Sequence, residues 1–441
     1  MRVGTWIRWA ALCAMMLMLA IGCGKKEGAE PAAPAQPDAE AGQGIGGEMT
    51  FFSWWTAGGE AEGLADLLNF FQKKFPGVKV INAAVAGGAG TNAKAVLKTR
   101  MMGGDPPDSF QVHGGSELID TWVKAGLMQP ITDLYQQEGW NDKFPQGLID
   151  MVSKDGEIYA VPSNVHRGNV LWVNRSLFEA QGIPVMNMNY EAFFDACEKF
   201  KAAGVAPLAL ASRNKWPVTH LFESILLGVG GPIFYQELFD GQIAWTDKRV
   251  KESLEILKRM MGYVNKDHAA LTWDQASGLV MQGKAAMNVM GDWAKGYFTT
   301  NGWIPDKDFG ALPAPQTGGR FVVVTDTFGL PKGAPNAAAA REFLKVVGSA
   351  EGQVAFNIKK GSIPARIGVP TDAFDPIAVR TIKDFAADRL VPSCAHGSAT
   401  VELFVTAIND ELGIFIQNLD PEKTMNALEA AALDAGVRKA Q

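Results

Sequence analysis

The stretch from Thr50 to Val80, TFFSWWTAGGEAEGLADLLNFFQKKFPGVKV, decides the fold. Its first residues are β-favouring and predict a strand that ends near Ser53. A short turn then leads into a helix, because apolar residues recur at helical spacing from Leu64 to Phe71. Phe75-Pro76-Gly77 ends the helix, and residues 78–81 predict the next strand. Strand, helix and strand form a βαβ unit, and open α/β sheets bind ligands at the edge where its first strand ends.

Two adjacent tryptophans, Trp54 and Trp55, stand at that strand end, close to Glu60. Successive side chains of a strand point to opposite faces, so the two rings cannot share one face. Both rings could be core, because tryptophan is mostly buried. The polar, glycine-flanked turn favours instead an exposed platform. A flat indole suits the C–H face of a pyranose, and a nearby carboxylate can accept hydrogen bonds from its hydroxyls.

The first residues of the chain predict export. Residues 1–22 begin with basic residues and continue as an apolar run, too short to span a membrane but typical of a secretory signal. Ala20-Ile21-Gly22-Cys23 resembles a bacterial lipobox, which predicts a diacylated Cys23; the alternative is an ordinary signal peptide with a chance cysteine. Residues 23–47 are rich in Ala, Pro and Gly and predict a flexible tether. We therefore expect a lipoprotein anchored to the membrane, periplasmic or otherwise outside the cytoplasm.

Composition narrows the range of functions. The chain has 441 residues, 47% of them hydrophobic, which is enough for two lobes and a large core. Its formal net charge of −6 argues against a nucleic-acid partner. Of the four cysteines, only Cys197 and Cys394 belong to the predicted folded part, where they either pair or lie buried as free thiols. No Cys/His spacing predicts a metal site, and we expect no cofactor.

Strands and helices alternate along the rest of the chain, which predicts an α/β fold. Two irregular or Pro-rich segments, residues 162–168 and 311–315, read as crossovers between two lobes. We expect residues 48–163 plus 316–370 to form an N-terminal lobe, and residues 164–315 plus 371–441 a C-terminal lobe. The ligand would lie in the interlobe cleft, and the lobes would close on it by a hinge motion.

The candidate polar groups do not form a recognisable catalytic set. A Ser-His-Asp hydrolase needs a G-x-S-x-G elbow, and the sequence has none. A glycosidase needs two carboxylates, for which Glu60, Asp292 and Asp326 are available. A mixed set of polar groups and aromatic rings suits neutral hydroxyls better than it suits catalysis. This set comprises Gln111, His113, Asp326, Lys360 and His396, with Trp55, Trp273 and Trp293. Trp293 repeats the strand-end pattern of Trp54 and Trp55, whereas Trp273 alone resembles a core residue.

Several blocks of sequence resemble one family. SWWTAGGEA, DPPDSFQVHGG, VPSNVHRGNV, NVMGDW and KKGSIPAR stand in the order found in the extracellular solute-binding lipoproteins of ATP-binding cassette (ABC) sugar importers, family 1. The closest similarity is to bacterial glucose/mannose-binding proteins, and it runs from about Met49 to the C-terminal helices. It implies a two-lobed periplasmic-binding-protein fold of type II. It also implies a monomeric, non-enzymatic protein that captures a monosaccharide (glucose, or mannose or galactose) and delivers it to a membrane permease.

The resemblance also implies a set of ligand-binding residues. Trp54 and Trp55 would stack on the sugar, and Glu60 would accept hydrogen bonds from it. The other expected contacts are Gln111, His113, Trp273, Trp293, Asp326, Lys360 and His396. Lys98, His166 and Asp292 lie near the family's site blocks. Two alternatives remain at this point: a binder of a disaccharide or oligosaccharide in the same fold, and a surface glycoside hydrolase.

Overall fold

The computed structural model describes residues 44–86 and 90–439. The predicted signal peptide, Cys23 and most of the predicted tether lie outside the described residues.

The first sheet contains the βαβ unit that the sequence predicts. Strand β1 (Gly47–Phe52) pairs in parallel with β2 (Val78–Asn82), and helix α1 (Gly58–Lys74) connects them. The order is β2-β1-β3-β14-β4, with β7 also paired to β14. The added strands are β3 (Ser109–His113), β4 (Met128–Gln129), β7 (Ala160–Pro162) and β14 (Asp326–Pro331). Because β14 runs antiparallel to β3, a segment from late in the chain closes the sheet.

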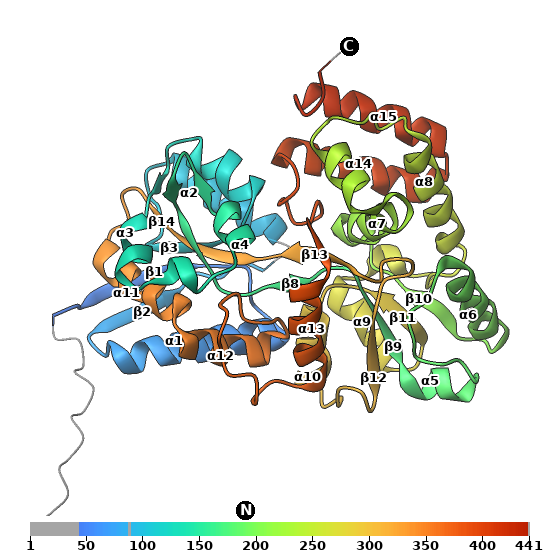
Figure 1. The fold of residues 1–441 in the computed structure, drawn as a ribbon, viewed down its shortest axis with the longest axis horizontal. Coiled ribbons are helices and arrows are strands. Elements are labelled where there is room, and N and C mark those ends of the chain that lie inside the picture. The colour runs from blue at the N-terminus through green and yellow to red at the C-terminus, as the bar shows by residue number, and fades with distance from the viewer. Residues whose placement is uncertain (1–43, 87–89, 440–441) are drawn as a thin grey trace, which may run out of the picture. The chain divides into compact units, whose positions relative to one another are not determined.

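Helices cover this sheet and complete what we call the first lobe. Helix α1 packs against α12, a contact between the blue and orange ends of the chain in Figure 1. The remaining short strands β5 and β6 form a hairpin whose turn is Asp155-Gly156, a pair of residues that favours a two-residue turn. The bounds are α2 (Thr91–Met102), a π-helix (Glu117–Val123), α3 (Thr132–Gln137), a 3₁₀ turn (Trp140–Asp142), α4 (Gln146–Met151), β5 (Ser153–Lys154), β6 (Glu157–Ile158), α11 (Ala337–Gly348) and α12 (Ala350–Lys360).

A second sheet, of order β10-β11-β9-β12, forms the second lobe. Strand β9 runs antiparallel to both of its neighbours. The bounds are β9 (Val170–Asn174), α5 (Arg175–Ala180), α6 (Tyr190–Ala202), β10 (Ala206–Ala209), α7 (Trp216–Phe239), α8 (Lys248–Met261), a 3₁₀ turn (His268–Ala270), α9 (Trp273–Met281), β11 (Ala285–Val289), α10 (Trp293–Thr300), β12 (Phe309–Pro313), α14 (Glu402–Asn418) and α15 (Pro421–Asp434). Separate hydrophobic clusters underlie the two sheets, and the lobe boundaries given above remain predictions.

Helix α7 is the core of the second lobe. Of the helices in the described residues, it alone is long and apolar enough to cross a membrane, and 72% of its most apolar window is buried in the protein. Its backbone breaks at Gly231, where φ is 79°, immediately before Pro232. Glycine adopts this φ without strain, and proline cannot continue the preceding hydrogen-bonding pattern. The burial and the kink identify a core helix of a folded domain.

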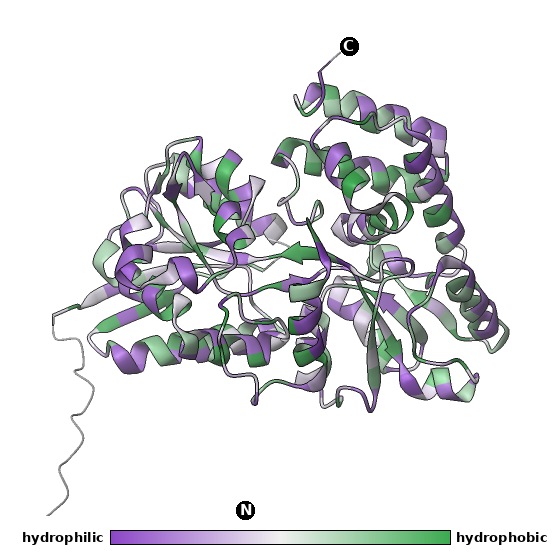
Figure 2. Cartoon of the chain, in the orientation of Figure 1, coloured by the Kyte–Doolittle hydropathy of each residue, from purple (hydrophilic) through white to green (hydrophobic). Residues whose placement is uncertain are grey.

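A third, short sheet joins the lobes. It has the order β15-β13-β8, with β8 (His166–Arg167), β13 (Arg320–Val324) and β15 (Arg389–Pro392) preceded by α13 (Pro376–Ala387). Each of its strands lies where the chain passes between lobes, and β13 is hydrophobic along most of its length (Figure 2). The first predicted crossover, residues 162–168, does connect β7 to β8. We call these three strands the hinge.

The second predicted crossover is wrong. Residues 309–313 form β12 and stay in the second lobe, paired with β9. Proline is tolerated there because β12 is an edge strand. The chain instead returns to the first lobe at Thr325, between β13 and β14. The change of lobe predicted after residue 370 precedes α13 and β15, the third strand of the hinge.

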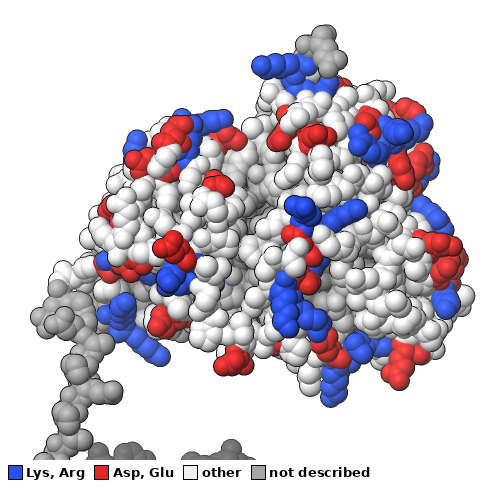
Figure 3. Space-filling view, in the orientation of Figure 1, with Lys and Arg blue, Asp and Glu red and all other residues white. Residues whose placement is uncertain are grey.

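The cysteine question is settled by the structure, in which Cys197 and Cys394 are both free and buried. Burial raises the pKa of the Cys197 thiol to about 12, so it is unreactive at neutral pH. The surface agrees with the modest net charge: on the face that Figure 3 shows, basic and acidic side chains are interspersed.

Candidate functional site

A small cavity lies where the two lobes and the hinge meet. Its volume is about 30 Å³, which corresponds to roughly two water molecules. The lining residues come from strand ends and helix ends of both lobes. They are Trp54, Trp55, Glu60, His113, His166, Trp216, Trp273, Trp293, Val324, Asp326, Lys360 and His396. A sugar ring needs more space than this, so some of the lining side chains must change position when a ligand binds between the lobes.

Asp326 is the polar centre of the cavity. It begins β14 opposite His113 of β3, and it is 3% exposed. Its carboxylate accepts hydrogen bonds from Gln111 Nε2 at 2.7 Å and Asn164 Nδ2 at 2.8 Å. Burial opposes its ionisation, but the Lys360 ammonium and the nearby imidazoles outweigh burial and hold the pKa of Asp326 far below its usual range. Asp326 is therefore a fixed anion.

The Glu117 carboxylate holds the His113 ring from the outer side of the site. Its Nδ1 lies 2.7 Å from Glu117 Oε2, and the same oxygen accepts a hydrogen bond from Lys94 Nζ at 2.7 Å. Glu117 begins a π-helix, a wider turn that is often found at functional sites. Burial opposes ionisation of Glu117, but Lys94 and His113 outweigh it and lower the pKa of this carboxyl. An ionised Glu117 makes His113 Nδ1 the protonated nitrogen.

His166 has the same arrangement in the other half of the site. Its Nδ1 is hydrogen-bonded to the Asp292 carboxylate, whose second oxygen accepts the Arg167 backbone N–H at 3.0 Å. Burial and Lys360 act to lower the pKa of His166, but the carboxylates of Asp292 and Asp326 outweigh them and raise it. The pair stabilises the junction between β8 and the turn that follows β11.

Aromatic rings form two walls. In the first lobe, Trp54 lies 5.0 Å from the His113 ring centroid, and Trp55 packs 5.0 Å from Phe356. In the second lobe, Trp293 meets His396 edge-on at 5.0 Å. Offset and edge-on pairs of this kind are favoured, and they hold the rings rigidly.

A charged pair closes one side of the cavity. Lys360 Nζ lies 2.7 Å from Glu60 Oε1 and 4.9 Å from the Trp55 ring centroid. Lys360 ends α12 and Glu60 begins α1, so each charge lies at the helix end that favours its sign. Both groups are thereby held facing the cavity.

Glycines bring the two lobes into backbone contact beside this pair. A Cβ on Gly296 of α10 would lie 2.7 Å from Lys360 O, and a Cβ on Gly59 of α1 would lie 3.0 Å from the Gly296 backbone. Only glycine permits such an approach. The lobes are therefore closed on each other in this structure.

The structure brings together nine of the ten residues expected at the site, and also His166. Gln111 does not line the cavity but lies behind Asp326, to which it donates a hydrogen bond, and it accepts the Trp54 backbone N–H at 3.2 Å. Asp292 likewise supports His166 and does not line the cavity. Lys98 is exposed on α2 and does not line the cavity, so its expected place near the site stays a prediction.

Other site residues were missed. Lys94, one turn before Lys98, reaches Glu117 and lies 5.8 Å from the Trp54 ring centroid. Trp216 lines the cavity from the start of α7, directly before Pro217. Proline near a helix start is a sequence signal that could have placed this tryptophan at an exposed helix end. Asn164 and Glu117 carry no such signal.

A larger cavity of about 630 Å³ lies on the other face of the hinge. Val324 lines the small cavity and Val323 the large one, and adjacent side chains of a strand point to opposite faces. Its walls are mainly apolar and come from α4, α13, β15 and the segment 363–369. The smaller cavity is the better candidate for the functional site, because polar groups and aromatic walls converge there.

Known proteins resemble this chain over most of its length. The family model of the bacterial extracellular solute-binding proteins matches residues 46–354. The chain belongs to this family. It is therefore a solute-binding protein and not an enzyme, as the resemblance implied.

The relatives extend this picture. An uncharacterized ABC transporter extracellular-binding protein of Pyrococcus horikoshii is 42% identical over 391 residues, covering 88% of this chain and 87% of its own. A probable sugar-binding periplasmic protein of Rhizobium meliloti is 31% identical over 385 residues, covering 86% and 92%. Among solved structures, the bacterial solute receptor AcbH matches with a TM-score of 0.78 at 22% identity, covering 88% and 98%. The two-lobed fold expected from the sequence is confirmed.

Proposed function

We propose that this chain is the substrate-binding component of an ABC sugar importer, and that it captures one monosaccharide and delivers it to a membrane permease. Relatives named as sugar-binding periplasmic proteins support the sugar class. Glucose is the first candidate sugar, with mannose and galactose as alternatives. The sugar contacts are the cavity residues described above.

The observation that carries this proposal is the composition of the cavity. A pyranose has apolar C–H faces and a rim of hydroxyls, so it needs aromatic surfaces above and below and hydrogen-bonding groups around it. Trp55 and Trp293 supply surfaces from opposite lobes, and Asp326, Glu60 and the imidazoles supply the rim. These groups need no tuned proton transfer to bind neutral hydroxyls.

A disaccharide or oligosaccharide is the second candidate ligand. Proteins with related sequences or folds carry both kinds of description: a glucose-binding protein of Saccharolobus solfataricus, 26% identical, and a chitin oligosaccharide binding protein with a TM-score of 0.77. The monosaccharide is favoured here because tryptophans and backbone contacts of both lobes surround the cavity on several sides. An oligosaccharide needs a groove that extends from the cavity and holds its further sugar rings.

Calorimetric titration of the purified protein with glucose, mannose, galactose, maltose and trehalose tests this proposal. We expect one-to-one binding of a monosaccharide with a Kd of micromolar order, about −8 kcal/mol. Binding of a disaccharide alone would replace the monosaccharide by the second candidate. No binding of any of the five sugars, or a continuing heat of turnover, would contradict the proposal.

The same proposal includes a monomer anchored through lipid on Cys23, with residues 23–47 as its tether. The replacement Cys23→Ser should move the protein from the membrane fraction to the soluble exported fraction. Retention of the variant in the membrane fraction would contradict the lipid anchor.

A further inference from the structure

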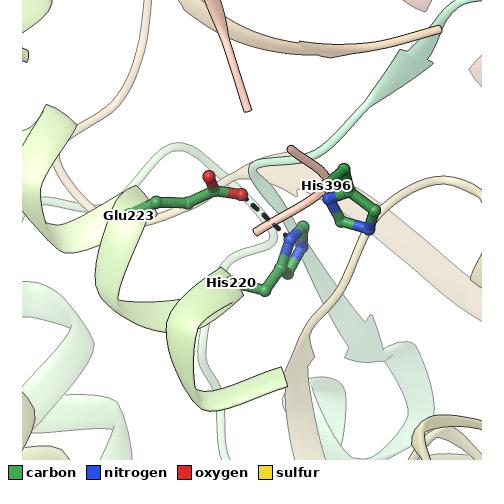
Figure 4. Close-up of side chains that lie close together, drawn as sticks. All are labelled: His220, Glu223 and His396. Atoms are coloured by element: carbon green, nitrogen blue, oxygen red, sulfur yellow. Dashed lines mark ion pairs between the residues drawn. The ribbon is translucent and has the colours of Figure 1, made fainter. Parts of the chain in front are cut away.

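A buried ionisable cluster lies directly behind the sugar site. His220 and Glu223 project from α7, and His396 comes from the loop after β15 (Figure 4). One ligand-type atom of each residue lies within 4.8 Å of the others, and none of the three is more than 3% exposed. Only His396 lines the cavity. A buried carboxylate is costly unless it serves neighbouring donors, so Glu223 requires an explanation.

Glu223 anchors the loop that carries His396. Its Oε2 accepts the backbone N–H groups of Cys394 at 2.7 Å and Ala395 at 3.1 Å, and the Tyr235 hydroxyl lies 3.2 Å from it and 3.0 Å from Pro392 O. The Ser393 hydroxyl lies 2.9 Å from Oε1 and 3.0 Å from Oε2. This carboxylate from α7 thus determines the conformation of residues 393–396.

The Ser393 hydroxyl connects Glu223 to His396, and Glu223 determines which way the hydroxyl proton points. A serine hydroxyl has one donor and two acceptor positions. Its proton goes to the carboxylate, which is the strongest acceptor in reach and has no proton to give back. The oxygen then accepts the His396 backbone N–H at 3.3 Å and the ring Nδ1–H at 2.9 Å. All three positions of the hydroxyl are satisfied in this arrangement.

We propose that Glu223, acting through Ser393, holds His396 as the neutral Nδ1–H tautomer, so that Nε2 faces the cavity as an acceptor for a sugar hydroxyl that donates its proton. Burial lowers the pKa of His396 well below its ordinary value, in keeping with a neutral ring. Glu223 and Ser393 are thus positioning residues that set specificity without touching the ligand. The inference rests on the proposed function of the cavity.

A bound metal ion is the competing explanation of the cluster. The ring nitrogens of His220 have no hydrogen-bond partner, and its Nδ1 lies 3.1 Å from Glu223 Oε1. Two observations disfavour a metal. Glu223 already accepts the backbone N–H groups of Cys394 and Ala395 and the Ser393 hydroxyl, and His396 Nδ1 is engaged by Ser393.

The substitution Glu223→Gln should reverse the direction of the hydrogen bonds that run from residue 223 through Ser393 to His396. The amide carbonyl would stay on the backbone N–H groups of Cys394 and Ala395, which turns the amide NH₂ toward Ser393. Ser393 would then accept from the amide and donate its own proton to His396 Nδ1, leaving the proton on Nε2. The acceptor in the cavity would become a donor, and sugar affinity should fall by about tenfold or more.

Nitrogen-15 NMR of histidine-labelled protein distinguishes the tautomers directly, and the chain has only five histidines. Comparison with His396→Gln assigns the ring. We expect Nδ1–H in the wild-type protein and Nε2–H in Glu223→Gln. Ser393→Ala, a second variant in case the first folds poorly, should give a mixture. Tyr235→Phe is the matched control: it removes a donor from the same carboxylate and should keep the wild-type tautomer.

An Nε2–H ring in the wild-type protein, or the same tautomer in Glu223→Gln, would overturn the inference. Stoichiometric Zn²⁺ binding to the wild-type protein that is lost in His220→Ala would also overturn it and establish the metal site. Failure of the wild-type protein to bind any sugar would instead overturn the proposed function, while an unexpected tautomer in a protein that binds sugar would overturn only the inference.

Discussion

A substitution at Gly296 would perturb lobe closure most directly. It lies inside α10 of the second lobe and touches the backbone of Lys359 and Lys360 in the first lobe. The substitution Gly296→Ala adds one methyl group at this contact and removes no polar group. We expect it to weaken sugar binding, because binding requires the lobes to close on each other.

The magnitude follows from three distances. The new Cβ would lie 2.7 Å from Lys360 O, 2.8 Å from Lys359 O and 3.0 Å from Lys360 C. Comfortable carbon–oxygen contacts are about 3.3–3.6 Å, so backbone on one side must retreat by roughly half an ångström. Overpacking of this kind costs about 1–3 kcal/mol, which would raise the Kd about 5- to 150-fold. Alanine should meanwhile favour the α10 helix itself by about 0.5–1 kcal/mol.

Calorimetric titration with the cognate sugar measures the change in Kd, and small-angle scattering with and without sugar measures closure. The matched control is Gly147→Ala, also on a helix, where an added Cβ meets nothing within 4 Å. The control should keep the wild-type Kd. A Gly296→Ala protein with unchanged affinity and unchanged compaction would refute the reasoning that binding uses this backbone contact.

Three further predictions concern single side chains. Asp326→Asn should lower the free energy of unfolding by roughly 2–4 kcal/mol in urea titrations, because one of the two amides that now donate to the carboxylate would face an NH₂ group. Trp55→Ala and Trp293→Ala should each weaken sugar binding by about 1–3 kcal/mol in calorimetry, and unchanged affinity in both would exclude stacking. Because the folded pKa of Glu117 is lowered, its stabilisation is present above about pH 4.3 and is lost as the pH falls through the folded value; Glu117→Gln should therefore differ from wild type in urea stability at pH 7, and the difference should shrink as the pH is lowered below about 4.3.

Much of the fold could be predicted because local signals agree with the tertiary structure. The βαβ unit lies where hydrophobic spacing and turn residues place it, and the first crossover connects the strands on either side of it. The second crossover was misplaced because the Pro-rich segment 311–315 was interpreted as a passage between lobes. Its strand, β12, is at the sheet edge, where proline is tolerated, and no local pattern reports edge position.

The site was predictable where chemistry coincides with a strand end. His113 ends β3, and Trp54 and Trp293 lie a few residues after β1 and β11; the ligand edge of an α/β sheet collects such residues. Lys94 and Lys98 share one face of α2 at helical spacing, so the pattern alone cannot separate them. The first turn of a helix lies nearer to the strand end that precedes it, which explains why Lys94 reaches Glu117.

The supporting groups could not be predicted from the sequence. Asn164 and Glu223 act from behind the cavity through hydrogen bonds that join segments distant in the chain, and Glu117 joins His113 to Lys94 on the preceding helix. A buried acid in an apolar helix such as α7 conflicts with local hydrophobicity, and its partners appear only after folding. Such exceptions to the hydrophobic pattern are expected at functional sites.

The central claim is that a single sugar ring binds between the tryptophans of the two lobes. A crystal structure of the protein grown with the sugar that binds best in calorimetry tests it most directly. The account predicts one pyranose between Trp55 and Trp293, with its hydroxyls bonded to Asp326 and to His396 Nε2. Sugar bound in the larger cavity on the Val323 face of the hinge, or outside both cavities, would contradict it.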